Sequence, residues 1–195
     1  MNVNLRYDIE FPAGIYFDDT LQLGYYSVAI NLCTATKDPL QINIAMERTK
    51  EFVRSILGNT VFISEKDQER IELLDMLNVN VTTLPEEPVD QIIGMMLYYK
   101  LNAIMEGRII VTELDLSSNL GDNVWYSHCE EDSSGPFAKD GWWHQPNTTH
   151  ADITTELMPD NVLKVTTTGW HEYGLEWIDA EKPNNTVVFG DFNKK

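Results

Sequence analysis

The strongest hydrophobic pattern in the chain covers residues 84–118. From residue 89 to residue 106, apolar side chains stand at nearly every helical position and leave almost no polar face. A helix that is apolar nearly all round is buried on several sides, so we expect this helix at the centre of the molecule. Asp90, Lys100 and Glu106 interrupt the run, which falls short of the roughly 20 apolar residues of a membrane span.

Local signals predict where this central helix begins and ends. Thr83 and Glu86 have the spacing of a capping box, and Pro85 suits the first helical turn. Gly107 is a typical helix stop. The branched residues between 108 and 116 predict a strand directly after it.

The first third of the chain predicts a β-hairpin followed by an amphipathic helix. The alternating residues 3–11 and the β-rich residues 21–32 are expected to pair as antiparallel strands. Asp38 and Pro39 predict a helix start, and apolar residues recur at spacings of three and four as far as Gly58. The opposite face of this helix carries mixed charges that we expect in solvent: Glu47, Arg48, Lys50, Glu51 and Arg54.

The middle of the chain alternates between strand-like and helix-like segments. Short β-like runs at 60–63 and 79–82 flank a helix-like stretch at 65–77, and the central helix and the strand at 108–116 follow. This β-α-β-α-β order favours right-handed crossovers and parallel pairing. The predicted class is therefore α+β with an α/β-like centre, preceded by the hairpin and helix and followed by antiparallel strands.

The last third has a different character. Residues 117–160 combine turn clusters with aromatic side chains and show little periodicity, which predicts a long aromatic-rich loop region. Antiparallel strands are expected at 162–170, 175–178 and 186–192. A chain of 195 residues suits a single globular domain over residues 1–195.

Charge and cysteine content restrict the classes of partner and compartment. The chain has 14 basic and 31 acidic residues, a formal net charge of −17, and no basic run, which argues against direct binding to nucleic acid or membranes. A basic protein partner fits this charge, and self-association into a homo-oligomer stays open. Cys33 and Cys129 are too few for a disulfide scaffold, and no secretory signal is evident, so we expect a cytoplasmic protein.

The four histidines all fall late in the chain, among acidic residues. His128, His144, His150 and His171 could supply nitrogen ligands to Zn²⁺ or a similar divalent metal. Their spacing matches no known metal motif, so no cofactor is expected and the metal site is an alternative. Surface or half-buried histidines that merely lie near one another in sequence are the favoured explanation of the pattern.

The tryptophans are concentrated in the same region and suggest a binding surface at Trp125, Trp142 and Trp143. Such side chains anchor many protein interfaces, although they also build a core where regular structure is sparse. Neighbouring side chains in an extended segment face opposite ways, so we expect Trp142 or Trp143 to be exposed.

These patterns favour a non-enzymatic, acidic, soluble accessory protein that acts by binding another protein through residues 117–177. The sequence contains no phosphate-binding glycine loop and no nucleophile elbow. One alternative is a metal-dependent hydrolase that uses the histidines and carboxylates of the same region. A second alternative is a DNA-mimicking inhibitor of a nucleic-acid-binding protein, which needs acidic residues spaced like phosphates along one surface.

Overall fold

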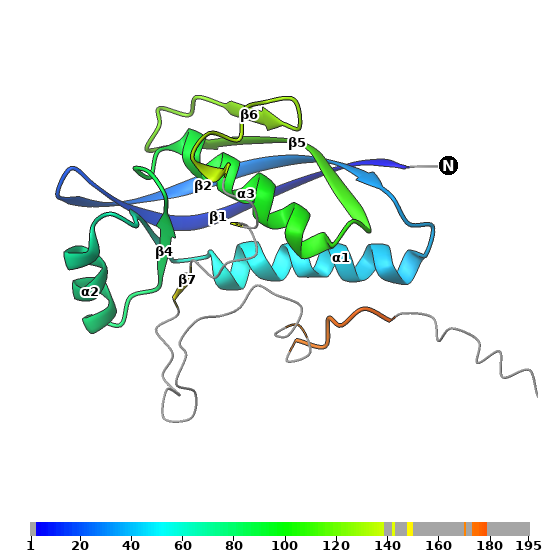
Figure 1. Cartoon of the computed structure of the whole chain (residues 1–195), viewed down its shortest axis with the longest axis horizontal. Coiled ribbons are helices and arrows are strands. Elements are labelled where there is room, and N and C mark those ends of the chain that lie inside the picture. Colours follow the sequence, from blue (N-terminus) through cyan, green and yellow to red (C-terminus); the bar gives the residue numbers. More distant parts are fainter. Residues whose placement is uncertain (1–2, 139–141, 143–147, 150–169, 171–172, 179–195) are drawn as a thin grey trace, which may run out of the picture.

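The computed structural model describes residues 3–138, 142, 148–149, 170 and 173–178 (Figure 1). Within these residues, seven strands form one mixed sheet in the order β6-β5-β2-β1-β3-β4-β7. The strands are β1 (Asn4–Phe17), β2 (Thr20–Thr34), β3 (Val61–Ser64), β4 (Val81–Leu84), β5 (Ile109–Ser118), β6 (Tyr126–Cys129) and β7 (Thr148–Thr149). The helices are α1 (Pro39–Glu51), continued by a π-helical turn at Phe52–Ile56, α2 (Gln68–Met76), α3 (Asp90–Met105), and a 3-10 turn at Gly135–Phe137. The fold is α+β, as the sequence predicts.

The N-terminal hairpin is the longest paired unit of the sheet. Strands β1 and β2 are antiparallel from the pair Asn4 and Cys33 to the pair Phe17 and Thr20. The two-residue turn between them is Asp18-Asp19, and both residues have positive φ, at 50° and 55°. Aspartate tolerates this left-handed conformation, which the hairpin twist requires. The predicted hairpin is confirmed.

The β-α-β-α-β order is confirmed, but its last strand pairs differently from the prediction. Strand β3 is parallel to β1 and to β4, whereas β5 is antiparallel to β2 and lies toward the opposite end of the sheet. Strand β5 pairs along the outer edge of the hairpin strand β2, whereas β4 pairs with β7 at the other end of the sheet. A parallel core is therefore limited to β1, β3 and β4.

Helix α3 is the buried central helix that the hydrophobic pattern predicts, and it ends where expected. Glu106 at its C-terminus has a left-handed φ of 47°, and Gly107 follows with φ 72°. The predicted capping box is wrong, because Thr83 belongs to strand β4 and the helix begins only at Asp90. Among the described residues, no helix is long and apolar enough to cross a membrane.

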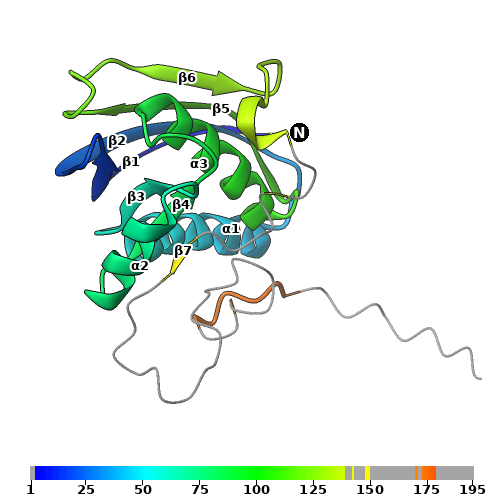
Figure 2. The ribbon, with the colours of Figure 1, turned by 60° about the vertical axis from the view of Figure 1, so that its left-hand side comes forward.

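The sheet has two unlike faces. Helices α1 and α3 lie on the same side of it and cover the strands there (Figures 1 and 2). The core forms between these layers and includes Phe11 and Ile30 of the hairpin, Met96 and Leu101 of α3, and Leu114 of β5. In the described part of the chain, no helix covers the other face of β1, β2, β5 and β6. We call this side the open face.

Most of the residues predicted to form C-terminal strands lie outside the described part of the chain. Residues 175–178 form no strand, so that prediction is wrong. The backbone amide of Leu175 donates to the carbonyl of Trp170, and the Leu175 carbonyl accepts a hydrogen bond from Arg48, in place of strand pairing. Residues 186–192, nearly all of 162–170, and most of 139–160 lie outside the described residues.

Candidate functional site

Of the four histidines predicted as metal ligands, the structure describes only His128. This residue lies in β6 and is buried, while His144, His150 and His171 lie outside the described residues. Among the described residues, no group of three or more histidine, cysteine, aspartate or glutamate side chains is arranged to hold a metal ion. The four-histidine site therefore stays a prediction.

The predicted tryptophan surface separates into two environments. Trp125 lies just before β6 and is 53% exposed, whereas Trp142 is 7% exposed. Trp142 packs edge to face against Phe137 with ring centroids 4.5 Å apart, and the ammonium of Lys100 lies 4.7 Å from its ring centroid. Trp143 lies outside the described residues, so the expectation of one buried and one exposed neighbour stays a prediction.

A cavity of about 360 Å³ lies between α3, β6 and the loop that follows β6, and we call it the His128 pocket. Its walls include Gln91, Ile92 and Met95 from α3, Tyr126 and His128 from β6, and Asp132 from the loop. The start of α3 is held in place because Asp90 accepts hydrogen bonds from the backbone nitrogen and the hydroxyl of Ser118, at 3.0 and 2.8 Å. These hydrogen bonds join the start of α3 to the end of β5, the strand that pairs with β6.

His128 is held between two tyrosine rings. Its ring meets Tyr98 edge to face at 4.9 Å between centroids and lies 5.6 Å from the ring of Tyr99. Its Nδ1 is 3.8 Å from a carboxylate oxygen of Asp132, and its buried Nε2 has no hydrogen-bond partner in the described part of the chain. Burial lowers the pKa of His128, and the nearby Asp132 opposes this only in part, so the imidazole is neutral at pH 7.

The charged side chains on the open face of the sheet are mostly acidic. In the strand register, Asp8 of β1 and Asp115 of β5 flank the small residue Ala29 of β2. The neighbouring rows add further charged positions on the same face, so that four acidic residues stand against one basic residue: Asp8, Glu10, Glu113, Asp115 and Arg6. Alternation places all of them opposite the helical layer.

Hydrogen bonds within the open face orient its carboxylates. Asn31 donates to Glu113 at 2.7 Å, and the hydroxyl of Ser127 donates to Asp115. Toward the hairpin tip the face becomes apolar, because Leu23 and Tyr25 are 74% and 67% exposed. The open face therefore combines fixed negative charge with an adjoining apolar strip.

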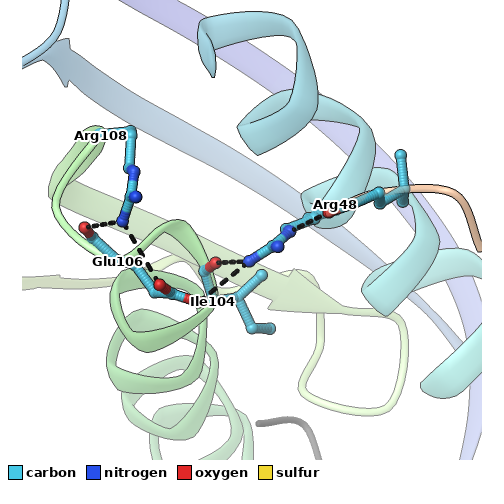
Figure 3. A network of polar contacts seen from close by, with 5 residues as sticks. Arg48, Ile104, Glu106 and Arg108 are labelled. Carbon is cyan, nitrogen blue, oxygen red and sulfur yellow. Dashed lines mark hydrogen bonds and ion pairs between the residues drawn. The ribbon is translucent and has the colours of Figure 1, made fainter. Parts of the chain in front are cut away.

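Arg48 of α1 is fully buried, contrary to the prediction that it lies in solvent. Its guanidinium donates to the carbonyl of Ile104 at 3.3 Å, to the carboxylate of Glu106 at 3.1 Å and to the carbonyl of Leu175 at 2.8 Å (Figure 3). Burial lowers the pKa of Arg48, and the hydrogen bond that Arg48 donates to Glu106 opposes the change. A sequence signal did exist: Arg48 is three residues after Ala45 and four before Phe52, which places it beside the apolar stripe.

Arg48 also contacts the C-terminal segment 173–178 and holds it against the helices. Its guanidinium lies 3.8 Å from the centroid of the Trp177 ring and 5.0 Å from that of Trp170. The guanidinium of Arg108 lies 4.3 Å from the Trp177 ring as well. We call these residues, together with Glu106, the arginine clamp. It anchors a distant segment and has the character of a structural site.

Lys100 of α3 is a second buried cation that the sequence analysis treated only as an interruption of an apolar run. Its side chain is fully buried beside Trp142. Burial lowers the pKa of Lys100 from 10.5 to about 7. The amine therefore changes charge near neutral pH, which an exposed lysine does not.

Comparisons with known proteins give a likeness of shape and no family. No family model and no curated protein matches the chain. An uncharacterized protein from Wolinella succinogenes superposes with a TM-score of 0.49 at 12% identity, covering 67% of this chain and 99% of that one. A 6-pyruvoyltetrahydropterin synthase variant from Plasmodium vivax gives 0.43 at 12% identity (66% and 97% covered), and the Plasmodium falciparum enzyme gives 0.42 at 13% (65% and 96%). At these values the likeness carries no argument about function.

Proposed function

We propose that this protein is an acidic accessory protein that binds a basic protein partner through the open face of its sheet. The observation that supports this most directly is the row of carboxylates at Asp8, Glu10, Glu113 and Asp115, on a sheet face that no described helix covers. The formal net charge of −17 adds a negative electrostatic potential around the whole molecule to that of this face.

The physical argument joins charge with apolar area. A negative face raises the association rate with a positive surface and disfavours acidic competitors. Leu23 and Tyr25 add exposed apolar surface beside the charged rows, which suits the aromatic and aliphatic anchors of protein interfaces. This location differs from the predicted surface at residues 117–177. The two surfaces meet where β6, which lies within that range, pairs with the strand that carries Asp115.

The test is affinity capture from the source cell with three versions of the full chain. These are the wild type, a double variant Asp8→Lys with Asp115→Lys on the open face, and a matched control Glu72→Lys with Asp75→Lys on the exposed side of α2. We expect one basic protein to be captured by the wild type and by the control, and to be lost with the open-face variant. Binding of the purified partner should then weaken steeply with salt concentration.

Three outcomes would contradict the proposal. One is equal capture by all three versions, and another is a captured partner that is acidic. The third is loss of capture with the α2 control, which would show that net charge alone decides binding. If the partner binds nucleic acid and duplex DNA displaces it, the DNA-mimic alternative gains the support instead.

A further inference from the structure

The His128 pocket has a volume within the range of small-molecule sites and lies apart from the acidic rows of the open face. Its volume of about 360 Å³ lies within the range of roughly 300 to 1,000 Å³ that is usual for ligand pockets. None of the described residues that line it is a lysine or an arginine. The charged group at the pocket is the half-exposed carboxylate of Asp132.

His128 forms part of the pocket wall, but its Nε2 is shielded by protein and adds no accessible acceptor to the pocket. The carboxylate of Asp132 beside Nδ1 favours the tautomer with its proton on that nitrogen, which leaves Nε2 as an acceptor. In the described residues Nε2 has no donor, and a buried polar atom without a partner costs free energy. A backbone hydrogen bond from Cys129 lowers the pKa of Asp132, so its carboxylate stays ionised at pH 7 beside the neutral imidazole.

The loop that closes the pocket is held in one conformation. The backbone amide of Cys129 donates to Asp132 at 2.8 Å, which turns the chain directly after β6. Gly135 has a φ of +50°, and a Cβ atom there would lie 3.1 Å from the terminal methyl of Met95. Glycine therefore lets the loop approach α3 closely. A pocket that is already formed loses less entropy when a ligand binds.

We propose that the His128 pocket binds a small organic cation that carries N–H donors, such as an amidinium or guanidinium group. The carboxylate of Asp132 compensates the positive charge and accepts hydrogen bonds from the N–H donors, and the hydroxyl of Ser133 lies in the same wall. The ring of Tyr126 adds a π face for the cation. Among the described lining residues an anion would meet a carboxylate and no cation, so we expect anions not to bind.

The first test uses three probes of nearly the same shape and different charge: benzamidinium, benzamide and benzoate. Each is titrated into the full-length wild-type protein at pH 7.5, with calorimetry for affinity and NMR of the His128 imidazole for location. We expect benzamidinium to bind about tenfold more tightly than benzamide and to shift the His128 resonances, with no binding of benzoate. Absence of benzamidinium binding, binding without a shift of His128, or equal affinity for all three probes would overturn the proposal.

The second test separates the specific contact from general charge. Asp132→Asn keeps an oxygen that can accept from Cys129 but removes the charge, while Glu131→Gln removes the same charge from an exposed neighbour that does not line the pocket. We expect Asp132→Asn to weaken benzamidinium binding about tenfold and Glu131→Gln to change it less than about twofold. Equal weakening by both would refute the pocket contact. The wild-type titration decides the matter if Asp132→Asn fails to fold.

Discussion

Arg48 and Lys100 are two cations buried in the same helical layer, and burial affects them differently. Both are fully inaccessible and both lie beside tryptophans from the last third of the chain, Trp177 for the arginine and Trp142 for the lysine. The arginine meets Glu106 and two backbone carbonyls with its planar donors. The pKa of the lysine is lowered to about 7 by burial.

The difference shows what allows a charge to remain inside a protein. A guanidinium spreads its charge over five donors and stays protonated when several acceptors surround it. An ammonium is a compact, strongly hydrated charge, so removal from water shifts its equilibrium toward the neutral amine. Arg48 therefore keeps its charge and its hydrogen bond to the C-terminal segment, whereas the charge of Lys100 depends on pH.

Replacing Arg48 with methionine is expected to have the largest effect on stability. The change keeps apolar bulk but removes the guanidinium from the Ile104 and Leu175 carbonyls and leaves Glu106 with Arg108 as its donor, so the free energy of unfolding should fall by about 3 kcal/mol. Urea denaturation measures the loss. The matched variant Arg54→Met, at an exposed position just past α1, should change stability by less than about 0.5 kcal/mol. Similar losses in the two variants would remove the distinction between clamp and surface arginines.

Lys100→Met is expected to change how stability depends on pH. The pKa of Lys100 is about 7 in the folded protein and 10.5 ordinarily, so between these values the unfolded chain binds more protons. Stability from this group therefore rises with pH, by roughly 1 kcal/mol per unit and about 2 kcal/mol in all between pH 7 and pH 9. Urea denaturation at several pH values should show this rise in the wild type and its absence in Lys100→Met.

The control for that measurement is Lys66→Met, which removes an exposed lysine. Its stability should follow the wild-type pH dependence over the same interval. A parallel course of the wild type and Lys100→Met would mean that the lysine keeps an ordinary titration, and the contrast with Arg48 would be lost.

The smallest of these effects is expected from Trp177→Leu. The change removes a ring that lies against the guanidinium groups of both Arg48 and Arg108, with a cost of about 1 kcal/mol. A double-mutant cycle with Arg48→Met tests the contact, because the tryptophan should matter less once Arg48 is absent. Additive losses would argue against a direct interaction. Trp125→Leu, at an exposed tryptophan, serves as the comparison.

Local patterns predicted most elements of the fold. The alternation in residues 3–11 identified the hairpin, the spacing of three and four identified α1, and the apolar run identified α3 as buried. These signals worked because each element has its own periodicity and its own burial. The start of α3 was misplaced, since a short strand before it ends in residues that also resemble a helix cap.

The candidate sites could be predicted from the sequence much less well than the fold. His128 was singled out as a metal ligand, yet the structure places it between Tyr98 and Tyr99, which are about thirty residues away. The open face requires the register of three strands before Asp8 and Asp115 can be seen to flank Ala29. Such neighbours are set by pairing between strands and not by spacing along the chain.

The sequence by itself determined the α+β class, the hairpin, the buried helix and the strong negative charge, because these follow from periodicity and composition. Only the tertiary structure decided that β5 returns antiparallel to β2, that Arg48 is buried and that acidic side chains gather on one face. The physical reason is that strand pairing and desolvation depend on contacts between segments far apart in the chain, which local patterns do not specify; the position of Arg48 beside an apolar stripe permits burial but does not determine it.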